Sequence, residues 1–412
     1  MKIPLSQPDI GELEIQYVTQ VLRSGQLSLG PRVTEFEEKF ADYVGTRYAA
    51  ATNSGTSALH LCVKALGIGF GDEVLTTSFS FVASVNCLLY ESATPVFVDI
   101  QPATLNIDPS DIRDVLSRDY IWDRQKCRHT NRRSGQTLKA ILPVHVFGHP
   151  CDMGAILEIA REFNLRVLED ACEAVGAEYR GQPVGTFGDA AVFAFYPNKQ
   201  MTTAEGGMIV TDDVQLATLC RSLRNHGRND SSEWLNHSRL GYNYRLSDLH
   251  CALGLAQLER IHELLYARAR IAELYSRKLE GTPGILLPAE PSTIKRSWFA
   301  YVIQVQGTNA KSLRDCLMNR LRDRDIACQS YFPPIHLQPY MNQAGARPTR
   351  VLPHTESAAK SCIALPFFSA MTERQVAEVC DTIREFLATP TLGEAAAVRY
   401  ATASGNYSAR GL

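Results

Sequence analysis

Short apolar segments alternate with amphipathic segments along the first half of the chain. The apolar segments are rich in β-branched and aromatic residues and predict strands, while apolar positions repeating every three or four residues predict helices between them. Segments that are apolar throughout and separated by helices predict a mostly parallel sheet covered on both faces. Strands are expected at 73–77, 95–99, 139–147, 166–170, 190–195 and 207–211, and helices at 56–66, 82–90 and 153–163.

The regions on either side of this α/β pattern differ from it. Two amphipathic helices are expected before it, at 12–24 and 31–44, and a long helix is expected at 246–279, where Gly281 and Pro283 end it. A strand at 298–305 and helices at 310–324 and 373–387 then predict a smaller α+β unit. We therefore expect an N-terminal arm and large domain over 1–270, a small C-terminal domain over 271–390, and a flexible tail over 391–412.

Composition narrows the class of protein. The 412 residues carry 42 Lys plus Arg against 44 Asp plus Glu, a net charge of −2, which argues against a general binder of nucleic acid or of acidic membranes. No apolar run is long enough to span a bilayer, and the N-terminus lacks the apolar core of a signal peptide. The eleven cysteines are scattered without a C-x-x-C pair, which favours reduced thiols over disulfides or a metal site. We expect a cytoplasmic protein.

The segment 118–139 stands apart because seven of its residues are basic and only two are acidic. It lies between a predicted helix and a predicted strand, where a short connection would suffice. Two interpretations remain open, namely a solvated surface insertion and a basic flap near a phosphate-bearing substrate.

The segment 189–210 carries the strongest chemical signal. An apolar strand ends in a loop with a single lysine, Lys199, and Thr202, Thr203 and the pair Gly206–Gly207 precede the next strand. Burial favours the neutral amine of a lysine, and a neutral amine can attack a carbonyl carbon to form a Schiff base. A lysine in an ordinary surface loop would give the same pattern.

A second strand, 166–170, delivers acidic residues to its carboxyl end. Ligands of open α/β sheets bind at that edge, and Asp170 is the last residue of the strand. A lysine that forms an imine with pyridoxal phosphate (PLP) needs a carboxylate partner for the pyridinium nitrogen, and Asp170 can supply it beside Lys199. Alternatively, Asp170 caps a following helix.

Two further segments carry weaker signals. Gly55 and Thr56 open a predicted helix, where backbone amides and hydroxyl groups attract a phosphate, although the same residues also form ordinary helix caps. Phe81 can present a ring that stacks on a cofactor, or it can belong to the core.

Six motifs in register resemble the DegT/StrS family of PLP-dependent sugar aminotransferases, over about residues 3–387. They are Ser-Gly-Thr-Ser-Ala-Leu at 54–59, Phe-Ser-Phe-Val-Ala-Ser at 79–84, Pro-Val-Phe-Val-Asp at 95–99, Glu-Asp-Ala-Cys-Glu-Ala at 169–174, Phe-Tyr-Pro-Asn-Lys-Gln at 195–200 and Gly-Tyr-Asn-Tyr-Arg-Leu-Ser-Asp at 241–248. The resemblance implies a type I, aspartate-aminotransferase-like fold that works as a homodimer.

The resemblance also assigns roles. Lys199 matches the aldimine lysine and proton carrier, Asp170 the partner of the pyridinium nitrogen, and Phe81 the stacking ring. Gly55 and Thr56 match the phosphate-binding turn. The remaining matches are Asn243, which reaches the phosphate from the other subunit, and His145 near the ring. Because the keto-sugars of this family are usually nucleotide-linked, basic or polar groups are expected at the mouth of the substrate pocket. The candidates are Arg224, His226, Arg228 and Arg245, each of which can equally be a surface charge of a loop.

Three positions depart from the commonest family pattern. Ala194 stands where a serine often donates to the phosphate, and Ala204 replaces a frequent glycine. Glu173 stands where glutamine is common near the phenolic oxygen of the cofactor, and two anions there would repel each other. Our hypothesis is that Glu173 shares a proton with that oxygen or turns away.

The implied activity is transfer of an amino group from L-glutamate to a keto-sugar, most simply a nucleotide-linked 3- or 4-keto-6-deoxyhexose. An aminocyclitol-forming transaminase acting on a keto-cyclitol would share every cofactor residue. A regulatory protein that holds PLP without turnover is a third possibility, but it would not need both Lys199 and Asp170. The expected partners are small-molecule substrates and a second copy of the chain, with no nucleic acid and no membrane.

Overall fold

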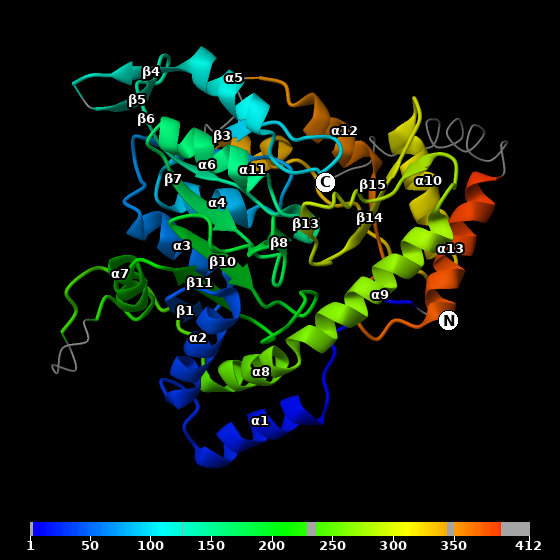
Figure 1. Cartoon of the computed structure of the whole chain (residues 1–412), viewed down its shortest axis with the longest axis horizontal. Coiled ribbons are helices and arrows are strands. Elements are labelled where there is room, and N and C mark those ends of the chain that lie inside the picture. The colour runs from blue at the N-terminus through cyan, green and yellow to red at the C-terminus, as the bar shows by residue number, and fades with distance from the viewer. Residues whose placement is uncertain (1–2, 126, 229–235, 344–349, 389–412) are drawn as a thin grey trace, which may run out of the picture.

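A large mixed sheet forms the centre of the molecule (Figure 1). The computed structural model describes residues 3–125, 127–228, 236–343 and 350–388. The strand order is β1–β11–β10–β7–β6–β2–β3, in which neighbours from β10 to β3 run parallel and β11 is antiparallel to both β1 and β10. The strands are β1 (Tyr48–Thr52), β2 (Asp72–Thr77), β3 (Thr94–Val98), β6 (Thr137–Leu142), β7 (Arg166–Asp170), β10 (Ala190–Ala194) and β11 (Gly207–Thr211).

Helices cover both faces of this sheet, as the apolar strands predict. In β10, Ala190 and Val192 join the apolar cluster on one face, while Ala191 and Phe193 join the cluster on the other. The first face packs against α3 (Gly55–Ala65), α4 (Ala83–Tyr90) and α7 (Val214–Arg224), and the second against α2 (Pro31–Val44), α5 (Pro109–Asp119), α6 (Met153–Glu162) and α8 (Asp248–Glu259). The predicted α/β class is confirmed.

Several elements differ from the predicted ones, three of them in or beside the large sheet. Strand β1 was not expected from its sequence, and β6 ends at Leu142 because Pro143 begins a loop that contains the short turn η1 (Val146–Gly148). The predicted long helix is two helices, α8 and α9 (Ile261–Leu279). The break falls at Arg260, whose guanidinium group binds the carboxylates of Asp9 and Glu14 in the N-terminal arm, which includes α1 (Glu12–Ser24).

The basic segment 118–139 contains a hairpin of β4 (Tyr120–Asp123) and β5 (Arg128–Asn131), which projects from the upper left of Figure 1. It joins the large sheet where Thr130 pairs with Thr137, at the amino end of β6. Because β6 and β7 are parallel, Asp170 lies at the other end of these strands. Within this chain the hairpin therefore lies at the opposite end of these strands from Asp170, which favours a surface insertion over a flap near the site of the same chain.

The C-terminal part has its own core. A three-stranded sheet of β12 (Ile285–Leu286), β14 (Tyr301–Val305) and β15 (Cys362–Leu365) packs with α9 and α13 (Glu373–Leu387). Ile261, at the start of α9, packs with the core of the large sheet, whereas Ile271 and Tyr275 pack in this second core. The division at 270 stays a prediction, and 391–412 lies outside the described residues. The other elements here are β13 (Ile294–Lys295), which pairs with β8 (Glu178–Tyr179) beside β9 (Gln182–Pro183), and α10 (Ala310–Arg322), η2 (Ile335–Leu337), α11 (Pro339–Gln343) and α12 (Pro353–Ser361).

Across the described ranges, no helix has both the length and the apolar character that crossing a bilayer requires.

Candidate active site

Asp170 lies at the carboxyl end of β7 and is almost fully buried. The hydroxyl group of Ser84 in α4 donates to its Oδ2 at 2.7 Å, and the amide of Cys172 donates to its Oδ1 at 3.1 Å. A turn rather than a helix follows β7, so helix capping does not account for Asp170. Two donors hold a carboxylate in a fixed orientation at the ligand-binding edge of the sheet.

Lys199 lies in the loop after β10, and its side chain is only 12% exposed. Its Nζ atom is 3.5 Å from Oε1 of Glu173 and 4.1 Å from the centre of the Phe299 ring. The guanidinium group of Arg268 donates to the backbone carbonyl of Lys199 at 2.8 Å. The amine is therefore enclosed and held against one carboxylate and one aromatic face, unlike the amine of a surface-loop lysine.

Glu173 does not turn away from the site. Its Oε2 accepts the amide of Phe147 at 2.8 Å, and its Oε1 faces Lys199. Burial raises the pKa of the Glu173 carboxyl group, and the positive charge of Lys199 and the amide of Phe147 oppose part of that rise. Glu173 therefore shares the environment of the reactive amine.

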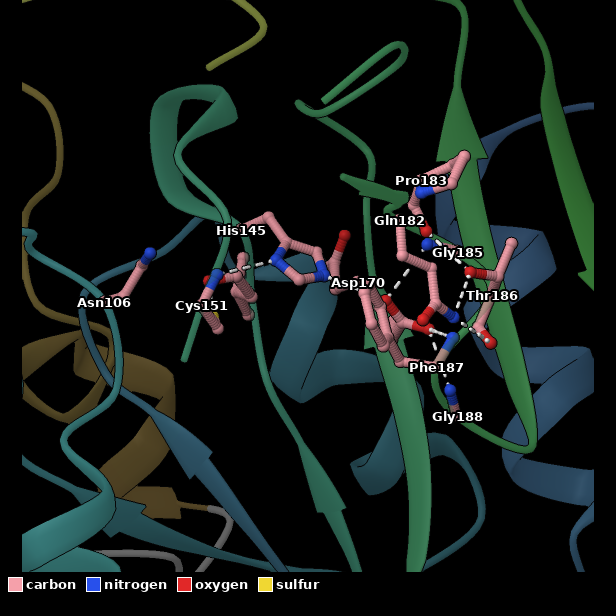
Figure 2. A network of polar contacts seen from close by, with 12 residues as sticks. Asn106, His145, Cys151, Asp170, Gln182, Pro183, Gly185, Thr186, Phe187 and Gly188 are labelled. Atoms are coloured by element: carbon pink, nitrogen blue, oxygen red, sulfur yellow. Dashed lines mark hydrogen bonds and ion pairs between the residues drawn. The ribbon is translucent and has the colours of Figure 1, made fainter. Parts of the chain in front are cut away.

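A buried network fixes the loops on both sides of β7 (Figure 2). Nδ1 of His145 accepts the amide of Cys151 at 3.0 Å, so the proton of the neutral ring is on Nε2, which donates to Glu169 at 3.2 Å. Both ring nitrogens of His145 are used inside the protein, and neither is free to bind substrate. The Glu169 carboxylate also accepts the amides of Gly185, Phe187 and Gly188.

The start of α3 lies close against β10. A Cβ atom on Gly55 would be 2.7 Å from Cβ of Ala194, so glycine is required for this approach. Ser54 accepts the amide of Ser57 with its hydroxyl group and that of Ala58 with its carbonyl group. Among the described residues, no acceptor binds the amides of Gly55 and Thr56, so they can bind a phosphate.

The structure also places Phe81 and Ala204, two further positions singled out in the sequence. The ring of Phe81, just before α4, is 61% exposed, so it is not a core residue in this chain. Ala204 has φ of 67°, a conformation that glycine adopts more readily than alanine.

The remaining predicted residues lie in two segments, 224–228 and 243–245, which pair with each other at Asn225 and Asn243. Asn243 is exposed and pairs by its backbone with Asn225, whose side chain accepts from Nη1 of Arg245 at 3.0 Å. Reduced hydration and the positive charges of Arg245 and Arg228 lower the pKa of His226. Within the part of the chain that the structure describes, none of these residues contacts Lys199.

Arg224 is a poor candidate for the mouth of the pocket. Its guanidinium group is paired with the buried carboxylate of Glu37 and also donates to the carbonyl group of Ala51. Arg224 therefore stabilises the packing of α2 and β1 rather than binding substrate.

A model of the DegT/DnrJ/EryC1/StrS aminotransferase family matches residues 8–384. The chain belongs to this family. It is 37% identical over 390 residues to the GDP-perosamine synthase of Caulobacter vibrioides, covering 94% of this chain and 98% of that protein. The crystal structure of S. venezuelae DesV in complex with a ketimine intermediate superposes with a TM-score of 0.83 at 32% identity, covering 94% and 99% of the two chains. The PLP form of the putative sugar aminotransferase Spr1654 from Streptococcus pneumoniae superposes with a TM-score of 0.84 at 27% identity, covering 94% and 99%.

These relationships confirm the predicted type I fold and identify a PLP-dependent aminotransferase. The residues present fit this cofactor. Lys199 would provide an enclosed amine, Asp170 a fixed carboxylate for the ring nitrogen, Phe81 an exposed ring, and the start of α3 two amides for the phosphate group.

Three residues of this site were missed in the sequence. Ser84 orients Asp170, Phe299 lies against the amine of Lys199, and Glu169 holds His145. The acidic pair at 169–170 was visible as a motif, but no local pattern links Phe299 to a lysine one hundred positions earlier.

Replacing Glu173 with glutamine is expected to change how the stability of the apoprotein depends on pH. A carboxyl group whose pKa is raised by folding stays protonated up to a higher pH in the folded state than in the unfolded state. The free energy of unfolding of the wild type therefore falls as the pH rises above 4.5, the ordinary pKa of a glutamate side chain. The melting temperature of Glu173→Gln relative to the wild type should therefore increase as the pH rises from 4.5 to 7.5. Thermal unfolding across this range tests the effect, and parallel pH profiles would contradict it.

Proposed function

We propose that this enzyme transfers the amino group of L-glutamate to a keto-sugar, most simply a nucleotide-linked 3- or 4-keto-6-deoxyhexose. The observation that carries the proposal is the enclosed Lys199–Glu173–Asp170 arrangement in a chain that is 37% identical to a GDP-perosamine synthase. We also infer a cytoplasmic homodimer in which Asn243 completes the phosphate site of the partner. Small molecules, rather than nucleic acid or membranes, are its substrates.

Lys199 and Asp170 have different roles in the proposed reaction. Bound PLP supplies an electron-withdrawing ring that stabilises negative charge on the carbon that loses a proton. The amine of Lys199 takes that proton and returns it, first for glutamate and then in the opposite direction for the keto-sugar. Asp170, held by Ser84, keeps a proton on the ring nitrogen throughout.

Neighbouring groups prepare Lys199 for this task. Oε1 of Glu173 lies 3.5 Å from Nζ of Lys199, and the ring of Phe299 shields one side of that amine from water. Amino transfer then takes place as two half-reactions at the same site, and 2-oxoglutarate is released before the keto-sugar reacts.

The proposal is tested by supplying the purified enzyme with PLP and ¹⁵N-labelled L-glutamate. Separate reactions contain GDP-, dTDP- or UDP-linked 4-keto-6-deoxyhexoses, the corresponding 3-keto sugars, or a keto-cyclitol. Mass spectrometry should find ¹⁵N in one nucleotide-linked amino sugar and 2-oxoglutarate in equal amount. Labelling of the keto-cyclitol alone, or formation of no labelled amine while glutamate still reacts, would overturn the assignment of a nucleotide sugar.

A further inference from the structure

A second polar cluster lies outside the residues described so far, between α3 and the end of α4. Its centre is Glu91, the C-cap residue of α4. The Glu91 carboxylate accepts from Nε2 of His60 at 2.8 Å, from Nζ of Lys64 at 2.9 Å and from the hydroxyl group of Tyr242 at 2.9 Å. His60 and Lys64 are one turn apart in α3 and therefore point the same way.

Glu91 and Lys64 form an ion pair in this cluster, which is mostly shielded from water. The side chain of Glu91 is 17% exposed and that of His60 is 6% exposed. Burial acts to raise the pKa of Glu91, but the donors on Lys64, His60 and Tyr242 outweigh burial and lower it overall. Removing the carboxylate would therefore leave three donors without their common acceptor, which is costly in a partly buried position.

This cluster fixes a short segment at 242–244. The rings of Tyr242 and Tyr244 stack at 4.9 Å between centres, with the Tyr242 hydroxyl group on Glu91 and the Tyr244 hydroxyl group 3.2 Å from Nδ1 of His60. The carbonyl group of Tyr244 also accepts the amide of Asn53, two residues before α3 begins. Both tyrosines that flank Asn243 are thus held on α3.

The side chain of Asn243 is expected to point away from the side chains of Tyr242 and Tyr244. Alternate side chains of an extended chain point to opposite sides, so the side chain between two inward-facing tyrosines points outward. Asn243 is indeed exposed. Its backbone pairs with Asn225, and the backbone groups of both neighbouring tyrosines are hydrogen-bonded to residues 223–226, which holds the segment in place.

We propose that Glu91 is a positioning residue that fixes Asn243 for the cofactor phosphate of a second copy of this chain. The proposal rests on the proposed function, in which the site is shared across a homodimer. Helix α3 then serves two sites, because its first turn faces the phosphate bound in its own subunit while its flank, through His60 and Glu91, orients Asn243 for the partner.

The test measures binding of the cofactor rather than turnover. Apoprotein is titrated with PLP, and in parallel with pyridoxal, which lacks the phosphate group. Glu91→Gln should weaken PLP binding about 3- to 10-fold, and Asn243→Ala about 10-fold or more, while neither changes the affinity for pyridoxal. The matched control is Glu35→Gln, because Glu35 also binds two cations, Arg32 and Lys39, but lies on α2 away from this segment.

A double variant separates positioning from general destabilisation. If Glu91 acts through Asn243, Glu91→Gln in the Asn243→Ala background should cause no further loss of PLP affinity. Additive losses, equal losses with pyridoxal, or an unchanged PLP affinity of Glu91→Gln would each overturn the proposal. If Asn243→Ala itself binds PLP normally, the shared phosphate site is wrong as well, whereas the labelled-glutamate reaction tests amino transfer independently.

Discussion

Replacing Lys199 with alanine is expected to lower the rate of amino transfer by at least about 10⁴-fold. The side chain of Lys199 is the amine held between Glu173 and Phe299, and within the described residues no other lysine contacts Glu173. Alanine removes both the group that binds the cofactor covalently and the group that carries the proton. Bulk water cannot replace a base that is fixed beside the reacting carbon.

Two measurements distinguish this loss from misfolding. After borohydride reduction of the wild type, mass spectrometry should find the cofactor attached to the peptide that contains Lys199, and the Lys199→Ala protein should carry none. Lys311→Ala, which alters an exposed lysine in α10, should keep the wild-type rate. Covalent cofactor in Lys199→Ala, or a rate within tenfold of the wild type, would show that another residue does this work.

The cofactor edge of the site was predictable because its residues follow apolar strands. β10 is apolar throughout and β7 has an apolar centre, so their ends could be located. Asp170 is the last residue of β7, and Lys199 lies in the loop that follows β10. Parallel strands bring such ends to one edge, which made their proximity a consequence of the fold. The family motifs then supplied the roles.

Contacts made across the fold were not predictable. Phe299 reaches Lys199 from the C-terminal part, and Glu91 meets Tyr242 because α4 and the 242–244 segment pack on the same side of α3. Strand β1 has three consecutive alanines, which favour helix, and it is extended because it pairs with β11 along its whole length. In β1, strand pairing therefore outweighed the local preference for helix.

Replacing Asp170 with asparagine is expected to lower the rate of both half-reactions by about 10²- to 10³-fold while leaving the fold intact. Asparagine has nearly the same shape and can still accept the hydrogen bond from Ser84, but it is neutral. Without the negative charge, the ring nitrogen loses the partner that keeps it protonated. The ring then withdraws electrons less strongly, and the carbon that loses its proton is less acidic.

A cofactor analogue separates this electrostatic role from a purely structural one. PLP methylated at the ring nitrogen carries a permanent positive charge, so it should restore at least part of the lost rate in Asp170→Asn, whereas it should slow the wild type, in which the methyl group occupies the place of the proton beside the carboxylate. Asp212→Asn, which alters an exposed carboxylate, should respond to the analogue as the wild type does. If the analogue gives Asp170→Asn no advantage over ordinary PLP, the effect of Asp170 is steric, and protonation of the ring must be maintained by another group.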